Sequence, residues 1–222
     1  SRRAGEILRR HPDLAARPPA PQARGTRPRA ELVRSAESAA GWRSDDDDRQ
    51  EALHRWQQRH LFGIVARDLL GQADTRQVGR HLATLAEATL ELALGALDPQ
   101  LPFAVVAVGR FGGAELSYAS DLDVLFVFDG SGAEDAAEAE RVAAGLLRTV
   151  AGSTPARRIY AVDADLRPEG RQGPLARSLV GFPAGGWVAA SEERVQEPRI
   201  ARGTCFRGGP DVEIGVRQGR DA

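Results

Sequence analysis

The sequence predicts an α+β fold, in which a mixed sheet with flanking helices is preceded by a pair of helices. Residues 103–108 and 124–128 are continuous apolar runs of the kind that form buried strands. Residues 133–150 have helical composition and follow the second run. A sheet with helices on one side indicates an α+β domain, and the same pattern also allows an α/β description.

Four segments are expected along the chain. Residues 1–47 are rich in Arg and Pro, with a helix-breaking run at 17–21, and predict a solvated linker, although their basic excess would also suit an acidic partner. Residues 48–98 predict the helical pair and 99–180 the catalytic core. Residues 181–222 are rich in Gly and Pro without periodicity, so we expect an irregular tail, disordered or frameshifted.

The helical pair is predicted from apolar side chains at helical spacing. The aspartates at 45–48 supply an N-cap and complement the helix dipole, and the first helix is expected to end near Gly71. The second helix is expected to stop before Pro99. The apolar positions are Leu53, Trp56, Leu61, Ile64, Val65 and Leu69 in the first helix, and Val78, Leu82, Leu85, Thr89 and Leu92 in the second.

A glycine-rich turn followed by two aspartates is the most informative motif. The turn, residues 109–113, follows the first strand, and its glycines let the backbone approach phosphate oxygens, which a Cβ would obstruct. Asp121 and Asp123 open the next strand and point to the same face, because successive side chains alternate. Such carboxylates repel each other unless a cation lies between them, and Mg²⁺ prefers one or two carboxylates plus phosphate oxygens. The motif therefore predicts a metal-dependent nucleotidyl-transfer site, whereas an isolated Asp-x-Asp pair would indicate only a solvated strand end.

A third carboxylate is expected on a neighbouring strand. Residues 158–166 alternate in the manner of a strand and contain Asp163 and Asp165. Both aspartates share one face, so spacing alone leaves both open as the third ligand.

Two sequence blocks resemble the glutamine synthetase adenylyltransferase family. The first has the form G-K/R-x-G-G-x-E-L-x-Y/F-x-S-D-x-D and is matched over residues 109–123. The second, V-D-x-x-L-R-P-x-G, is matched over residues 162–170, about forty residues later and in the same order. The resemblance implies a polymerase-β-like nucleotidyltransferase core and puts the third carboxylate at Asp163, with Asp165 at a variable position.

The resemblance also implies roles for single residues. Asp121, Asp123 and Asp163 would be the catalytic and metal-binding carboxylates, with Mg²⁺ as cofactor and ATP as substrate. The acceptor would be a tyrosine of glutamine synthetase, and regulatory proteins of nitrogen signalling would be further partners. The nucleotide would be bound by Gly109, Arg110, Gly112, Gly113 and Ser120.

The three carboxylates do not determine the direction of the reaction. The family combines a domain that adds AMP with one that removes it by phosphorolysis, and the same trio would serve both. The run Ser117 to Asp123 and the Arg-Pro-Glu-Gly run from Arg167 look more like the adenylylating domain. An inactive fragment or a binding module is the alternative from another functional class.

Composition narrows the remaining classes. A formal net charge of −1 argues against a dedicated nucleic-acid binder. Cys205 is the single cysteine, which excludes a disulfide framework, and no apolar run reaches membrane-spanning length. His54, His60 and His81 lie on the predicted helices without a matching ligand cluster, so we expect structural roles. A cytoplasmic protein without a membrane partner is expected.

Overall fold

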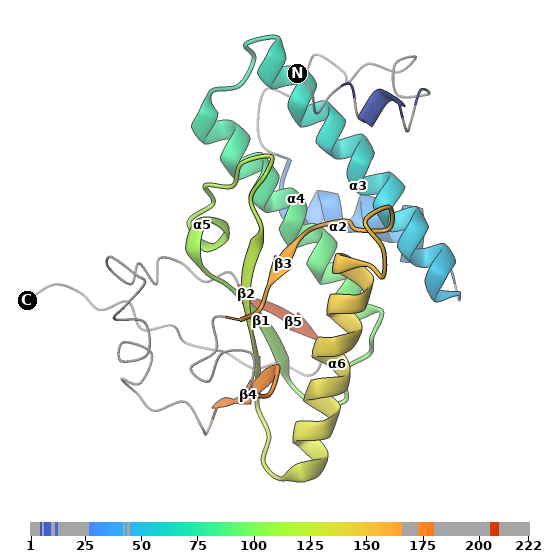
Figure 1. Cartoon of the computed structure of the whole chain (residues 1–222), viewed down its shortest axis with the longest axis vertical. Helices are drawn as coiled ribbons and strands as arrows, with labels where there is room; N and C mark the ends of the chain where they lie inside the picture. Colours follow the sequence, from blue (N-terminus) through green and yellow to red (C-terminus); the bar gives the residue numbers. More distant parts are fainter. Residues whose placement is uncertain are drawn as a thin grey trace, which may run out of the picture.

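The computed structural model describes residues 5, 7–9, 12, 27–41, 43, 45–165, 173–179 and, for the backbone, 205–208. Its helices and strands follow the predicted order, with a helical layer preceding a mixed sheet (Figure 1). The α+β prediction is confirmed. The elements in chain order are α2 (Arg29–Ala36), η2 (Glu37–Gly41), α3 (Asp46–Leu69), α4 (Thr75–Gly95), β1 (Phe103–Ala107), α5 (Gly109–Gly112), β2 (Leu122–Phe128), α6 (Ala133–Ala151), β3 (Val162–Asp163), β4 (Ala176–Ser178) and β5 (Cys205–Gly208).

Both predicted helices of the pair are present as α3 and α4, and each begins with a capping aspartate. The side chain of Asp45 accepts a hydrogen bond from the N–H of Asp48 at 2.9 Å, as the acidic run predicted. Asp74 and Gln77 form a reciprocal capping box at the start of α4. Leu69, predicted on the buried face, is 56% exposed because it lies in the last turn of α3, where the chain reverses.

Part of the predicted linker is helical. The π-helical stretch η2 continues directly from α2. Leu32, Val33 and Ala36 form a buried stripe on α2, and Arg29 makes an ion pair with Glu91 of α4 at 2.9 Å. The linker prediction is wrong for this segment, because these side chains give a short helix an apolar face that packs on α4.

The sheet is mixed, in the order β3-β2-β1-β5, and β4 also pairs with β2. β1 runs antiparallel to β2 and β5, whereas β3 and β4 pair with β2 in parallel. β3 lies beside the start of β2 and β4 beside its end. β5 falls within the predicted irregular tail and is a correction to it.

The buried core lies between this sheet and the helices. The strand pair β1–β2 is almost entirely buried, and α4 and α6 pack on each other beside it (Figure 1). The core is continuous from α2 to the sheet. This close-packed core supports the start of β2, where the predicted aspartates lie. No helix in the described part of the chain is long and apolar enough to cross a membrane.

Candidate functional site

The turn after β1 brings the backbone against the Asp123 side chain. Gly109 has a φ of +56°, and a Cβ built on it would lie 2.5 Å from Oδ2 of Asp123. Any residue other than glycine is therefore unfavourable at position 109 for two reasons, the positive φ and the contact with Asp123. The N–H of Val108 also donates to the carbonyl of Asp123 at 3.0 Å, which fastens the turn to β2.

Two amide groups of the turn form hydrogen bonds within it. The N–H groups of Gly112 and Gly113 donate to the carbonyls of Val108 and Gly109 at 2.9 and 3.0 Å. These two N–H groups are engaged within the turn, and nucleotide binding by Gly112 and Gly113 stays a prediction. The N–H groups that open the turn, at residues 109–111, have no acceptor within it, as at any helix start.

The predicted carboxylates meet at the start of β2. Asp123 lies in β2 and is the register partner of Asp163 in β3, and Asp121 precedes β2 and is exposed. Burial raises the pKa of Asp123, and the negative charges of Asp163 and Asp121 raise it further, while the charge of Arg110 opposes them. Three carboxylates and one guanidinium thus share one electrostatic environment.

Asp163 and Asp165 have different positions. Asp163 forms part of β3 beside Asp123, whereas Asp165 follows the strand and its N–H donates to Oδ1 of Asp163 at 2.9 Å. The parallel pairing of β2 and β3 is what brings Asp163, from forty positions later in the chain, next to Asp123. Residues 166–170 of the second sequence block, including Arg167, lie outside the described residues.

The carboxylates fit part of a divalent metal site. No group of three or more His, Cys, Asp or Glu side chains among the described residues is already placed so that it could hold a metal ion. Asp123 and Asp163 nevertheless provide two neighbouring carboxylates whose mutual repulsion a cation would relieve. Mg²⁺ is commonly held by one or two carboxylates with phosphate oxygens and waters as the other ligands. The residues present therefore fit a site that is completed by a phosphate-bearing substrate.

The loop between the turn and β2 is braced by the helical pair. The hydroxyl of Tyr118 donates to Oδ2 of Asp68 on α3 at 2.9 Å. Gly79 of α4 lies so close to the loop that a Cβ there would be 3.3 Å from the carbonyl oxygen of Leu116. Within the loop, Oγ of Ser120 accepts from the N–H of Ser117 at 3.0 Å, so this predicted nucleotide ligand also shapes the loop.

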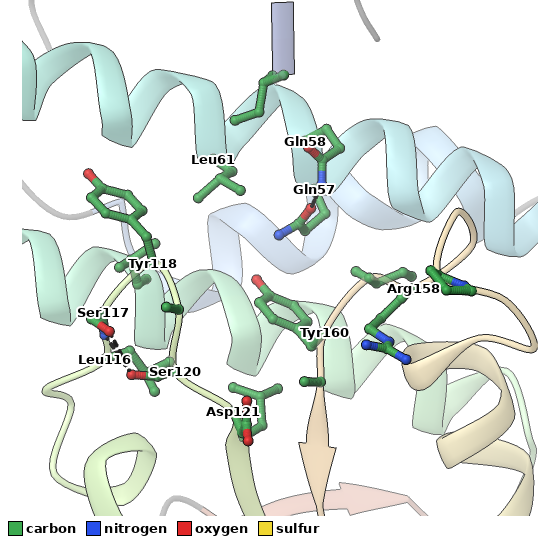
Figure 2. Close-up of a pocket in the computed structure, with 17 residues that line it drawn as sticks. Gln57, Gln58, Leu61, Leu116, Ser117, Tyr118, Ser120, Asp121, Arg158 and Tyr160 are labelled. Atoms are coloured by element: carbon green, nitrogen blue, oxygen red, sulfur yellow. Dashed lines mark hydrogen bonds between the residues drawn. The ribbon is translucent and has the colours of Figure 1, made fainter. Parts of the chain in front are cut away.

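A pocket of about 310 Å³ opens beside Asp121 (Figure 2). It lies between α3 and the segments 116–122 and 155–161. Gln57 and Gln58 of α3 are buried there at 1% and 5% exposure, and Nε2 of Gln58 donates to Oε1 of Gln57 at 2.8 Å. Helical periodicity gave no sign of these two residues, because adjacent glutamines are normally found on a solvated helix face.

His60 on α3 and His81 on α4 both have lowered pKa values. The ring of His60 contacts Trp56 with centroids 4.6 Å apart, and burial, followed by the charges of Arg27 and Arg59, lowers the pKa of His60 to about 4. Burial also lowers the pKa of His81 in α4.

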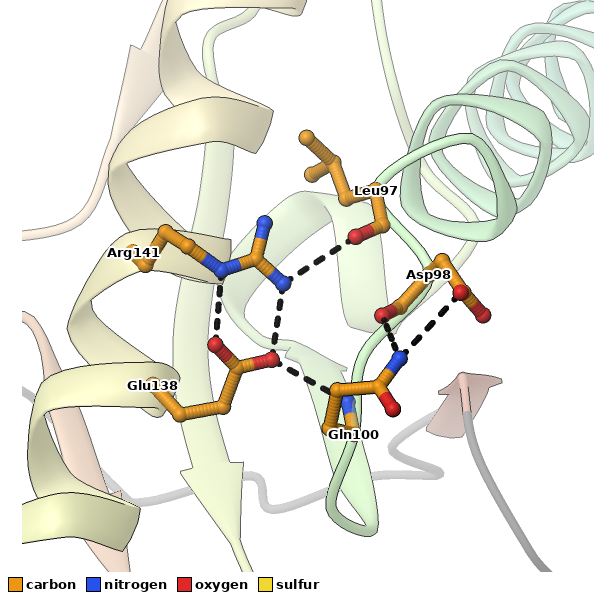
Figure 3. A network of polar contacts seen from close by, with 5 residues as sticks. All are labelled: Leu97, Asp98, Gln100, Glu138 and Arg141. Atoms are coloured by element: carbon orange, nitrogen blue, oxygen red, sulfur yellow. Dashed lines mark hydrogen bonds and ion pairs between the residues drawn. The ribbon is translucent and has the colours of Figure 1, made fainter.

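A polar network joins α6 to the approach of β1 (Figure 3). Arg141 donates to both carboxylate oxygens of Glu138 at 2.6 and 2.7 Å and to the carbonyl of Leu97 at 3.1 Å. The hydrogen bonds from Arg141 and from the N–H of Gln100 lower the pKa of Glu138 to about 2. The network holds the entry to β1, at the opposite end of that strand from the glycine turn.

Comparison with known proteins adds independent information. A family profile described as glutamate-ammonia ligase adenylyltransferase matches residues 1–184. Several relatives are named bifunctional glutamine synthetase adenylyltransferase/adenylyl-removing enzyme. The relative of Cutibacterium acnes is 38% identical over 69% of this chain and 16% of its own length. The relative of Mycobacterium marinum is 34% identical over 97% of this chain and 22% of its own length. The relative of Streptomyces avermitilis is 42% identical over 54% of this chain and 13% of its own length. The chain thus spans less than a quarter of the length of these relatives.

Proposed function

The chain belongs to the glutamate-ammonia ligase adenylyltransferase family, and from this premise we propose that it contributes the nucleotidyl-transfer site of such an enzyme. The reaction is transfer of AMP from ATP to a tyrosine hydroxyl of glutamine synthetase, with release of pyrophosphate. The observation that carries the proposal is the register pairing of Asp123 with Asp163 beside Gly109, where a Cβ would meet the Asp123 carboxylate.

The carboxylates hold the reacting groups. Asp123 and Asp163, with Asp121 beside them, would hold Mg²⁺ together with the phosphates of ATP. When bound, the cation supplies positive charge that stabilises the attacking and leaving oxygens of the displacement. We assign to Asp163, the register partner of Asp123, the role of accepting the phenolic proton as the tyrosine oxygen attacks.

The turn at residues 109–113 receives the departing pyrophosphate. Its opening N–H groups have no acceptor in the turn, and they suit phosphate oxygens. Arg110 is exposed, and its charge already acts on Asp123, so it is near enough to offset the negative charge that develops on the leaving group. The absence of a side chain at Gly109 keeps the Asp123 carboxylate in place.

Adenylylation is favoured over removal of AMP. The relatives carry both activities in their name, and one carboxylate trio can support either direction. The sequence of the loop from Ser117 to Asp123 resembles that of adenylylating domains, which supports addition of AMP.

Two assays with the same chain separate the directions. With Mg²⁺ and α-labelled ATP, the chain is expected to transfer label to unmodified glutamine synthetase. With Mg²⁺, phosphate and adenylylated glutamine synthetase, a removing enzyme would release ADP instead. Release of ADP without any transfer of label would reverse the proposed direction, and absence of both, from a chain that is folded, would contradict the function.

A further inference from the structure

We propose that the pocket between α3 and the segments 116–122 and 155–161 is the acceptor subsite, which receives the tyrosine side chain that carries or accepts AMP. The pocket is the 310 Å³ cavity of Figure 2. This inference rests on the proposed function, and it assigns to that site a place for its second substrate.

The position of the pocket follows from the geometry of the displacement. In an in-line reaction at phosphorus, the attacking and leaving oxygens lie on opposite sides of the phosphoryl group. The leaving side is the turn at residues 109–113. The pocket contains none of these residues but includes Ser120, Asp121 and Leu122 at the start of β2 and Ala161 at the approach to β3. Asp121 is the one of the three carboxylates that lines the pocket, and an acceptor oxygen entering from it would reach the site from a side that the turn does not occupy.

The walls of the pocket match a phenol ring. Apolar side chains make up much of the lining, namely those of Leu61, Leu82, Leu116, Leu122 and Ile159. Its volume of about 310 Å³ is at the lower end of the roughly 300–1,000 Å³ of ligand pockets, which suits one aromatic side chain with adjoining peptide better than a whole nucleotide.

The polar groups of the pocket suit a peptide. Gln57 uses its Oε1 to accept from Gln58, which leaves the amide N–H groups of Gln57 as donors, and Figure 2 shows this amide directed toward Tyr160 across the cavity. A donor that is 1% exposed and faces a cavity fits a carbonyl of the acceptor segment. Arg158 is exposed at the opening and provides a positive charge for the acceptor protein.

The chemical step balances with these groups alone. The phenolic oxygen forms a bond to the α-phosphorus of ATP, the bond from that phosphorus to the bridging oxygen breaks, and pyrophosphate departs with the electron pair. The phenolic proton passes to Asp163 and then to solvent. In the reverse direction with phosphate as the attacking group, adenylyl-tyrosine occupies the same pocket, so the subsite does not depend on the direction of the reaction.

The inference is tested by measuring the affinity of the chain for AMP and for O-adenylyl-tyrosine, by titration calorimetry with Mg²⁺. The wild-type chain is expected to bind O-adenylyl-tyrosine at least about tenfold more tightly than AMP, which corresponds to about 1.4 kcal/mol. Gln57→Leu, which keeps the volume but removes the amide, and Ala119→Trp, which fills the opening from an exposed position, should each abolish this difference. Arg59→Leu, an exposed position on the same helix, serves as the matched control and should preserve it.

Each outcome decides a separate point. Loss of the difference in both pocket variants, with the affinity for AMP within twofold of wild type, supports the acceptor subsite. An unchanged difference in Ala119→Trp overturns it, even if Gln57→Leu does not fold. A loss of AMP affinity equal to the loss for O-adenylyl-tyrosine would assign the pocket to the nucleoside and also overturn it. If the folded wild-type chain binds neither compound, the proposed function fails, and the subsite with it.

Discussion

Replacing Gly109 with alanine tests whether the turn after β1 sets the position of the central carboxylate. The new Cβ would lie 2.5 Å from Oδ2 of Asp123, whereas ordinary contact begins at 3.4 Å, so the carboxylate must move by about 0.9 Å (3.4 − 2.5). A misplacement of about 1 Å in a reacting constellation costs on the order of 100-fold in rate. Alanine at a φ of +56° also costs about 1–2 kcal/mol of folding free energy.

Gly71→Ala provides the matched control. Gly71 has a φ of +66°, but a Cβ there would have nothing within 4 Å. Both variants should therefore lose about 1–2 kcal/mol in urea denaturation. Transfer of AMP from α-labelled ATP should fall about 100-fold in Gly109→Ala and less than twofold in Gly71→Ala. Near-normal transfer by a folded Gly109→Ala chain would refute the argument that this glycine holds Asp123 in place.

Three further predictions concern side-chain contacts of α3, of the loop before β2 and of α6. The pKa of His60 is lowered from 6.5 to about 4, so the unfolded state binds the extra proton between these values. His60 should therefore lower the free energy of unfolding by about 2 kcal/mol from pH 7 to pH 5, and His60→Gln should lose this part of the pH dependence in urea denaturation. Tyr118→Phe removes the hydroxyl that donates to the Asp68 carboxylate, so it should cost about 1–2 kcal/mol of stability and lower transfer about tenfold. Asp68→Asn keeps an acceptor for this hydroxyl and should have a smaller effect. Equal kcat values for Tyr118→Phe and wild type would show that this hydrogen bond does not position the loop. Because the pKa of Glu138 is lowered from 4.5 to about 2, the stabilising effect of its carboxylate should be present above pH 4.5 and disappear toward pH 2. The difference in Tm between wild type and Glu138→Gln should therefore shrink over that range and stay constant at higher pH.

The helices and central strands were predictable because their signals are local. The apolar spacing from Leu53 to Val65 and the capping aspartate at 45 locate α3, and the continuous apolar run after Asp123 locates β2. In each case the residues that determine the element lie within the element itself. The strand at Asp163 is only two residues long, so its extent depends on its pairing with β2 rather than on its own sequence.

Contacts between distant segments could not be predicted from spacing. Tyr118 and Asp68 are separated by 50 positions, and no local sequence pattern around either residue indicates that they are in contact. The choice between Asp163 and Asp165 was open on alternation alone, and only the parallel register beside Asp123 distinguishes their positions. Burial of Gln57 depends on the loop and the segment before β3 that enclose it. These features arise from tertiary packing, which overrides the local preference of a polar residue for solvent.

The most direct test of the carboxylate site compares three single substitutions in the transfer of AMP from α-labelled ATP to unmodified glutamine synthetase. Asp123→Asn and Asp163→Asn each remove one of the paired carboxylates, and Asp165→Asn is the matched control, because this residue lies outside β3. We predict that transfer falls at least about 1,000-fold in the first two variants, since several kcal/mol of charge stabilisation depend on these ligands, and less than about threefold in Asp165→Asn. Near-normal transfer by Asp123→Asn, or a larger loss in Asp165→Asn than in Asp163→Asn, would contradict this prediction.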